Sequence, residues 1–212
     1  MVIYDDMVQG SKEWHLLRCG LPTASMASKL VTSAGKASTS ITDYAYTLAT
    51  EKFVGQPVDA WEGNEHTDRG SLLENDARIA CEQKQGYWVE QIGFATSDDS
   101  NYGCSPDGLV DEDGMIELKC PMGKNIVKNW MYYDKHNKAM PDYIPQIQMA
   151  MFVCEREWAD LCFYHNQLPL LVIRQKADKE FHKVLKEQIA KCLEIRDSAL
   201  VIIERSEYAK ND

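Results

Sequence analysis

The sequence predicts a mixed α/β (α+β) fold in which a central sheet is flanked by helices. A β-hairpin pattern joins the segment 105–108 to the segment 116–121 through the turn residues 111–114. Two more β-type segments follow at 159–164 and 168–174, and helical periodicity dominates both ends of the chain. Because the 212 residues contain no repeat, we expect one domain over 1–212. N-terminal helices should occupy about 10–55 and the core about 69–200.

The N-terminal part is expected to form three helices. Ser11 can cap the first, which carries Trp14, Leu17 and Arg18, and a second helix should start after Pro22. Arg18, Thr23 and Ser25 then surround a helix N-terminus, an arrangement typical of phosphate binding or of simple capping. Segment 33–40 should be a mobile loop, and a third helix should run from about 42 to 54. The residues expected on buried sides are Met26, Leu30, Tyr44, Leu48 and Phe53.

The next helix is expected over about 69–84. Leu73, Ala77, Ala80 and Cys81 recur with helical spacing, so one side should be buried. Glu74 lies beside this stripe. A carboxylate at such a position is either an ordinary surface group or is directed at a positively charged group. A strand over 87–96 should then join the hairpin in an antiparallel set.

The C-terminal half is expected to alternate helices and strands. A helix over 125–132 carries lysines, and another begins at Pro145 with Gln146 among its first polar groups. After the strands 159–164 and 168–174 comes a long closing helix, to which we assign a structural role. The apolar residues expected on the Pro145 helix are Ile147, Ala150, Met151 and Cys154.

The hairpin brings together side chains that suit phosphodiester hydrolysis. Strand residues alternate faces, so Glu117 and Lys119 share one face, and the turn places Asp107 beside Glu117. Carboxylate oxygens are the ligands that Mg²⁺ prefers. A lysine beside them can orient a water, act as a base or stabilise the charge on phosphorus. A surface hairpin with an ordinary salt bridge is the alternative interpretation.

The net charge of −10 opposes a nucleic-acid role, because DNA affinity depends largely on neutralising phosphates. Basic residues nevertheless cluster in two regions, so a basic groove can exist on an acidic body. These residues are Lys119, Lys124, Lys128, Lys135 and Lys138 after the hairpin, and Lys12, Arg18, Lys29 and Lys36 near the start.

The seven cysteines form no CxxC pair, which predicts reduced core thiols in place of a zinc or iron–sulfur site. No apolar run approaches the roughly 18 residues of a membrane span, and the start lacks the pattern of a signal peptide. We expect a cytoplasmic protein without membrane contact.

Four segments, taken together, resemble one known family. They are WHLLRCGLPTAS at 14–25, RGSLLENDA at 69–77, CSPDG followed by IELKCP within 104–121, and YIPQIQMAM at 143–151. Their order and spacing are similar to the phage lambda exonuclease family, the YqaJ-type viral recombinases of the PD-(D/E)xK nuclease superfamily. The resemblance covers about residues 10–200 and implies a restriction-endonuclease-like core.

The resemblance implies a 5′-to-3′ exonuclease that degrades one strand of linear double-stranded DNA, leaving 3′ overhangs for recombination by strand annealing. It also implies a homotrimeric ring around DNA, a single-strand annealing protein as partner, and a phage or prophage protein in a bacterial cell. The implied metal site is Glu74, Asp107, Glu117 and the main-chain carbonyl of Leu118, with Lys119 as the catalytic lysine and Gln146 beside it. The implied 5′-phosphate site is Arg18, Ser25 and Ser105.

We hypothesise two Mg²⁺ ions, which Mn²⁺ can replace. Asp107, Glu117 and the Leu118 carbonyl would hold one ion, and Asp107 would share the other with the Glu74 side of the site. The alternatives are a structure-specific endonuclease of the same superfamily, such as a resolvase or repair nuclease, and a non-catalytic DNA-end binding module. The family's strand-splitting wedge uses large apolar residues, whereas the stretch 64–68 is polar. Trp61 or the loop 33–40 is a candidate substitute.

Overall fold

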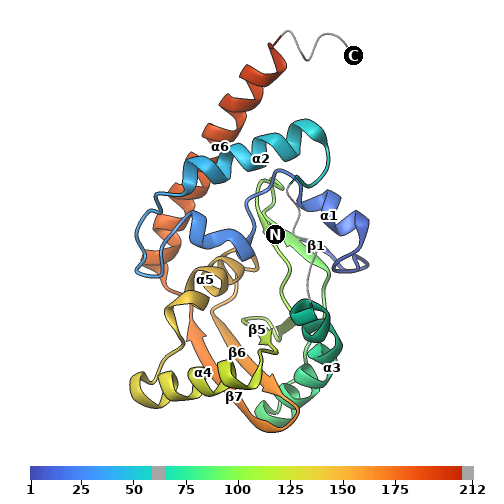
Figure 1. Ribbon diagram of the computed structural model, residues 1–212, viewed down its shortest axis with the longest axis vertical. Helices are drawn as coiled ribbons and strands as arrows, with labels where there is room; N and C mark the ends of the chain where they lie inside the picture. The colour runs from blue at the N-terminus through green and yellow to red at the C-terminus, as the bar shows by residue number, and fades with distance from the viewer. Residues whose placement is uncertain (59–64, 207–212) are drawn as a thin grey trace.

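A mixed four-stranded sheet forms the centre of the computed structural model, which describes residues 1–58 and 65–206 and the side chains of 1–58 and 73–206 (Figure 1). Its strands, in spatial order, are β4 (Gly108–Val110), β5 (Gly114–Lys119), β6 (Trp158–His165) and β7 (Leu168–Lys176). β5 and β6 run parallel, whereas the β4–β5 and β6–β7 pairs are antiparallel. The predicted hairpin and the two later strands are therefore confirmed.

A second, antiparallel sheet is formed by three short strands, β1 (Val2–Tyr4), β2 (Phe94–Thr96) and β3 (Gly103–Cys104). The single strand predicted over 87–96 is wrong, because this segment passes from one sheet to the other. Glu90 forms an isolated bridge with Leu109, while Phe94 already pairs with β1. Between them, the backbone at Gly93 lies so close to Met7 that a Cβ there would be 1.8 Å from the Met7 carbonyl oxygen. A glycine permits this change of sheet.

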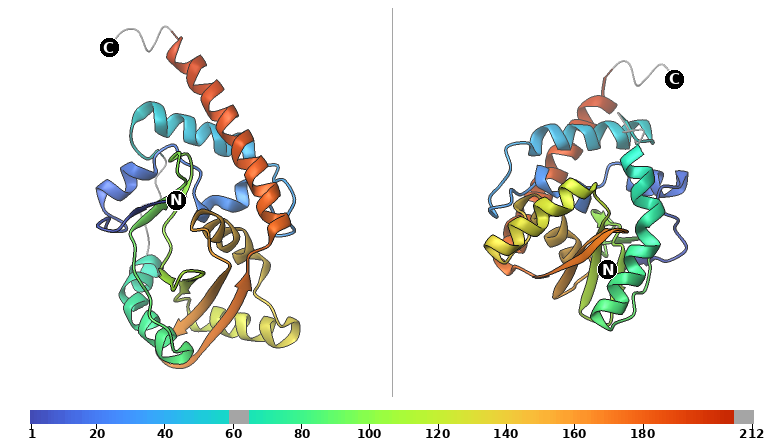
Figure 2. Two further views of the ribbon diagram at one scale, coloured as in Figure 1. Left: turned by 180° about the vertical axis from the view of Figure 1, so that it is seen from behind. Right: turned by 60° about the horizontal axis from the view of Figure 1, so that its bottom comes forward.

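Helices cover both faces of the four-stranded sheet (Figure 2). α4 and α5 connect the parallel strands β5 and β6, and α3 lies on the opposite side. The α-helices are α1 (Lys12–Arg18), α2 (Ile41–Val54), α3 (Glu65–Gln85), α4 (Gly123–His136), α5 (Ile144–Val153) and α6 (Lys179–Glu204). The 3₁₀ helices are η1 (Ala24–Lys29) and η2 (Pro141–Tyr143). The Ser11 hydroxyl accepts a hydrogen bond from the Trp14 N–H at 3.1 Å, which confirms the predicted cap of α1.

Buried residues gather on the two faces of the sheet according to strand alternation. Met115 of β5 belongs to the larger cluster, together with residues of α5 and α6. Ile116 and Leu118 of the same strand belong to the smaller cluster, with Ala77 of α3. Glu117 lies between these two residues in sequence, so it points to the α5 side of the sheet.

Some sequence-based expectations for the N-terminal half are wrong. The segment after Pro22 is a 3₁₀ helix with a three-residue turn, which leaves Met26 39% exposed. Phe53, in the last turn of α2, is 45% exposed. The stretch 33–40 includes a turn in which the Thr32 N–H donates to the Lys36 carbonyl at 2.7 Å, while its mobility stays a prediction. α3 begins at Glu65, before the expected start near 69, and Trp61 lies outside the described residues.

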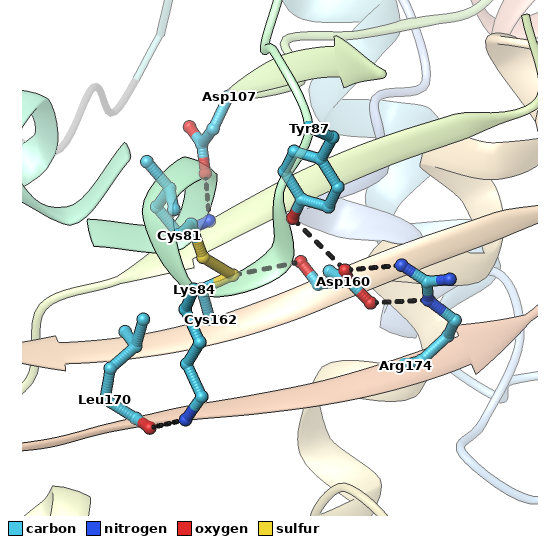
Figure 3. Close-up of a disulfide and its surroundings, with 9 residues drawn as sticks. Cys81, Lys84, Tyr87, Asp107, Asp160, Cys162, Leu170 and Arg174 are labelled. Carbon is cyan, nitrogen blue, oxygen red and sulfur yellow. Dashed lines mark hydrogen bonds and ion pairs between the residues drawn. A yellow bond between two sulfur atoms is a disulfide. The ribbon is translucent and has the colours of Figure 1, made fainter. Parts of the chain in front are cut away.

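The cysteine expectation is also corrected. Cys81 of α3 and Cys162 of β6 form a disulfide, although 81 positions separate them in sequence (Figure 3). Sequence spacing cannot reveal this pair, because it depends on how α3 packs on the sheet. The cysteines outside this disulfide are Cys19, Cys104, Cys120, Cys154 and Cys192. Among the helices described, none is long and apolar enough to span a bilayer.

Candidate active site

The β4–β5 hairpin places Asp107 beside the catalytic strand that the sequence predicts. The register pairs Gly108 with Ile116, so Asp107 and Glu117 are next to each other across the end of the hairpin. The Asp107 carboxylate accepts a hydrogen bond from the Leu118 N–H at 2.5 Å. This bond fixes the orientation of the carboxylate relative to the backbone that carries Glu117 and Lys119.

Glu117, Lys119 and Gln146 form one hydrogen-bonded group. Glu117 is 3% exposed, and its Oε1 lies 2.6 Å from Lys119 Nζ. The Gln146 amide, from α5, donates to the same oxygen at 2.5 Å and accepts from Lys119 Nζ at 3.5 Å. The alternation predicted for β5 thus brings Glu117 and Lys119 to one face, where α5 supplies the glutamine.

The charges of this group raise several pKa values. Burial raises the pKa of Asp107 well above its ordinary value, and the nearby charge of Glu117 adds to this effect. Burial and the Glu117 charge also raise the pKa of Glu74. For Lys119, burial lowers the pKa, but the carboxylates of Glu117 and Asp107 raise it by more, so the amine is held in its charged form. The site therefore concentrates negative charge, with one ammonium group bound to it.

Glu74 and Asp107 line one cavity of about 550 Å³, whose wall also includes Gln9 and Trp14. No group of three or more acidic, histidine or cysteine side chains that could hold a metal ion occurs within the described part of the chain. The donor set is nevertheless suited to a hard divalent cation. It consists of oxygens only, and the Asp107 and Glu74 carboxyl groups line the same cavity. The residues thus fit Mg²⁺, while the role of Glu74 remains a prediction.

Arg18, Ser25 and Ser105 meet at a second cluster. The guanidinium donates from Nη1 to Ser105 Oγ at 3.3 Å and from Nη2 to Ser25 Oγ at 3.1 Å. Burial lowers the pKa of Arg18, which still carries its charge in proteins. Among the described residues, Arg18 forms no salt bridge with a carboxylate. A partly buried cation whose partners are hydroxyl groups can accept an anion such as a phosphate.

Trp14 supports this cluster, although the sequence-based prediction assigned it no functional role. Its indole N–H donates to Ser105 Oγ at 2.8 Å, and the Arg18 guanidinium lies over its ring at 3.8 Å from the centroid. The sequence contains a signal for this contact. Trp14 and Arg18 are four residues apart, so they lie on the same side of a helix, where arginine can stack on tryptophan.

The turn at Gly20 fixes the position of Arg18, two residues before it. The Gly20 N–H donates to Glu51 of α2 at 3.0 Å, and its carbonyl accepts from the buried Arg196 of α6 at 2.7 Å. Gly20 has a φ of +70°, and a Cβ there would lie 2.8 Å from the Cβ of Lys52. Glu51 and Arg196 carry no sequence motif, so only the packing of the two helices reveals their role.

The lysines that follow the hairpin lie on the surface. Lys124, Lys128 and Lys135 are exposed on α4, and Lys138 is exposed just after it. α4 begins four residues after Lys119 in sequence.

Comparisons with known proteins agree with this geometry. The family model of the YqaJ-like viral recombinase domain matches residues 13–157, a range that contains every predicted site residue. A solved structure of an alkaline exonuclease (LHK-Exo) from Laribacter hongkongensis is 27% identical, with a TM-score of 0.81 over 95% of this chain and 100% of that chain. The structure of LHK-Exo in complex with dAMP is 26% identical, with a TM-score of 0.79 and the same coverage.

A more distant match shows the fold alone. A phage related exonuclease from Haemophilus somnus 129PT is 20% identical, with a TM-score of 0.63 over 96% of this chain and 98% of that chain. The search among curated proteins found no match. The mixed sheet and its flanking helices are thus those of PD-(D/E)xK exonuclease structures, as the sequence predicted.

Proposed function

Because this chain belongs to the family with a YqaJ-like viral recombinase domain, we propose that it degrades linear double-stranded DNA from its ends. The chain is a nuclease, and its proposed reaction is Mg²⁺-dependent 5′-to-3′ exonucleolytic hydrolysis that leaves 3′ single-stranded overhangs for recombination. The similarity to alkaline exonucleases over nearly the whole chain supports this class of reaction.

One observation carries the proposal: the cluster of Arg18, Ser25 and Ser105 is adjacent to the carboxylates of Asp107 and Glu117. Ser105, which binds Arg18 and Trp14, is only two residues from Asp107. Two residues of extended chain span at most about 7 Å. A single terminal nucleotide could therefore contact Arg18 with its 5′ phosphate while its next phosphodiester lies at Asp107 and Glu117. Such an arrangement selects ends and sets the position of cleavage.

The proposed roles follow from the contacts of each residue. Asp107, Glu117, the Leu118 carbonyl and Glu74 would hold two divalent cations, and Mn²⁺ would serve in place of Mg²⁺. Bound there, the cations lower the pKa of water and neutralise charge on the scissile phosphate. Lys119 holds its proton beside Glu117, so it can orient the attacking water and stabilise the developing negative charge. Gln146 holds the Glu117 carboxylate in place.

The proposal includes the assembly and the cellular setting. We propose a homotrimeric ring around the DNA, a single-strand annealing protein as partner, and action in the cytoplasm of a bacterial cell that carries a phage or prophage. These points rest on the family resemblance. Sedimentation of the purified chain should give three times its mass; a monomer at all concentrations would contradict the ring.

The test uses linear duplex DNA labelled at the 5′ or the 3′ terminus, with Mg²⁺ present or chelated. We expect early release of 5′-terminal label as mononucleotide, late release of 3′ label, and no release with chelator. Covalently closed circular duplex is the control, since an exonuclease leaves it intact. Lys119→Ala should bind DNA ends but lose most of its turnover. Cleavage of the closed circle, or a full rate in Lys119→Ala, would refute the proposed mechanism.

A further inference from the structure

The Cys81–Cys162 disulfide connects two elements that carry or adjoin the proposed metal ligands (Figure 3). Cys81 follows Glu74 by seven residues, about two helical turns, so both lie on the same side of α3. Cys162 of β6 pairs in register with Leu118 of β5, which lies between Glu117 and Lys119. One covalent bond therefore ties the helix of Glu74 to the strand beside that of Glu117. We call it the α3–β6 bridge.

Apart from the bridge, the described side chains of α3, residues 73–85, bury little apolar surface. Of its described side chains, Ala77 and Cys81 are the ones that are fully buried. Both are small and remove little apolar surface from water, compared with a leucine or phenylalanine. A polar contact to the sheet, from Lys84 Nζ to the Leu170 carbonyl at 2.6 Å, lies near the C-terminal end of the helix, away from Glu74. The bridge is therefore the strongest link between the Glu74 part of α3 and the sheet.

We propose that the α3–β6 bridge is a redox-controlled positioning element for the metal site. As a disulfide, it holds α3 against β6, so that Glu74 faces the cavity it shares with Asp107. As two thiols, Cys81 and Cys162 let the helix move away from the sheet, and Glu74 contributes less to metal binding. This inference rests on the proposed function, because it assigns Glu74 a role in that reaction.

The chemistry is ordinary thiol–disulfide exchange. On closure, two S–H bonds break and one S–S bond forms. The two protons and two electrons pass to a low-molecular-weight disulfide, which becomes two thiols; a dithiol reverses the process. Because both sulfur-bearing residues are completely buried, exchange requires local opening of α3. Interconversion should therefore be slow in the native protein and faster when the helix is loosened.

The alternative is a purely structural bridge. In that case reduction would lower the unfolding temperature but leave the dependence on Mg²⁺ unchanged. A positioning role predicts more, since the groups that orient metal ligands typically change metal affinity by about 10- to 100-fold when removed. The amount of Mg²⁺ needed is thus the quantity that separates the two roles.

The experiment compares the protein oxidised with oxidised glutathione and the protein reduced with dithiothreitol. Thiol titration after denaturation should count five thiols in the oxidised form, those of the cysteines outside the bridge, and all seven in the reduced form. In each form, Mg²⁺ is titrated against the unfolding temperature and against the rate of DNA degradation. We expect the reduced form to need roughly tenfold more Mg²⁺ in both titrations, with an unchanged KM for DNA ends.

Two variants serve as controls. Cys81→Ala/Cys162→Ala should behave like the reduced protein and no longer respond to dithiothreitol. Cys192→Ala removes a buried thiol of α6 and should keep the full response. Hydrogen exchange of residues 73–85 supplies a readout without DNA, and reduction should increase exchange there.

The outcomes are distinguishable from those of the proposed function. Equal Mg²⁺ requirements in the two forms would overturn the inference, as would unchanged exchange in 73–85 or seven titratable thiols after oxidation. If the oxidised protein degrades no DNA with any divalent metal, the proposed function fails. The thermal titration and the hydrogen exchange would still test the bridge in that case.

Discussion

Arg18→Lys should keep the positive charge at this position but remove the planar donor geometry that we propose recognises a 5′ phosphate. Arginine at this position donates to Ser25 and Ser105 from two different nitrogens and stacks on Trp14. A lysine keeps the charge but presents a single nitrogen without a planar fork. The substitution therefore tests whether the fork itself reads the terminal phosphate.

The size of the effect follows from the contacts that are lost. A hydrogen bond to a charged group contributes about 1.5–3 kcal/mol. Stacking of a guanidinium on an indole contributes about 0.5–1 kcal/mol at a partly exposed site. The stacking is present with either 5′ group and cancels in the comparison, so losing one bond to the phosphate should cost roughly 1.5–3 kcal/mol, or about 12- to 160-fold in the preference for 5′-phosphorylated over 5′-hydroxyl ends.

The assay is the ratio of kcat/KM for two duplexes that differ only in the 5′ group. This ratio cancels changes in active enzyme concentration. Arg174→Lys is a matched control, because Arg174 lies 3.7 Å from the centroid of the Trp158 ring and also makes two hydrogen bonds, both to Asp160. It should lower the unfolding temperature and leave the ratio unchanged. A wild-type ratio in Arg18→Lys would show that the phosphate is bound elsewhere.

Three further predictions concern charge and packing. Asp107→Asn should abolish turnover but raise the unfolding temperature at pH 7 in the absence of divalent metal. The pKa of Asp107 is raised in the folded state, so its stabilising contribution exists at low pH and is lost as the pH rises through that pKa. Asn can still accept the Leu118 bond, and the difference from wild type should vanish below about pH 4; an unfolding temperature below that of wild type at pH 7 would contradict this. Arg174→Met should lower the free energy of unfolding by about 1–3 kcal/mol, because the buried Asp160 side chain loses its two 2.8 Å bonds to the half-exposed arginine but keeps the bond from the Tyr87 hydroxyl; urea denaturation measures this, and no measurable loss would refute it. Glu51→Ala removes the acceptor of the Gly20 N–H and should keep the fold but reduce the 5′-phosphate preference several-fold through Gly20, and an unchanged kcat/KM ratio would refute this positioning role.

The parts of the site that lie within one local element were predictable from the sequence. Alternation on β5 gave Glu117 and Lys119 a common face, and the turn at 111–114 set Asp107 beside them. The cap at Ser11 and the long helix α6 also follow from short-range patterns. These features depend on contacts between residues close in sequence, for which periodicity is a direct signal.

The remaining features depend on contacts across the chain. Gln146 reaches Glu117 because α5 packs against β6, the strand next to β5, and the family resemblance, not any local pattern, selected it. The Cys81–Cys162 pair joins elements 81 positions apart, and Arg196 reaches Gly20 across 176. No local pattern encodes such a distance. The missed change of sheet at Gly93 has the same origin, since it arises from the close approach of Met7.

The connection between the two halves of the site is a short and rigid piece of backbone. Ser105 belongs to the phosphate cluster and Asp107 to the carboxylate group, with Pro106 between them. The proline ring fixes one backbone dihedral, and the Pro106 carbonyl accepts a hydrogen bond from the Gln9 amide at 3.2 Å. The distance from the proposed phosphate-binding cluster to the proposed hydrolytic residues is therefore set by main chain, whose geometry varies less than that of rotatable side chains. A nuclease built in this way would remove units of constant length, because residues 105–107 set the spacing between the position of the terminal phosphate and that of the scissile phosphate.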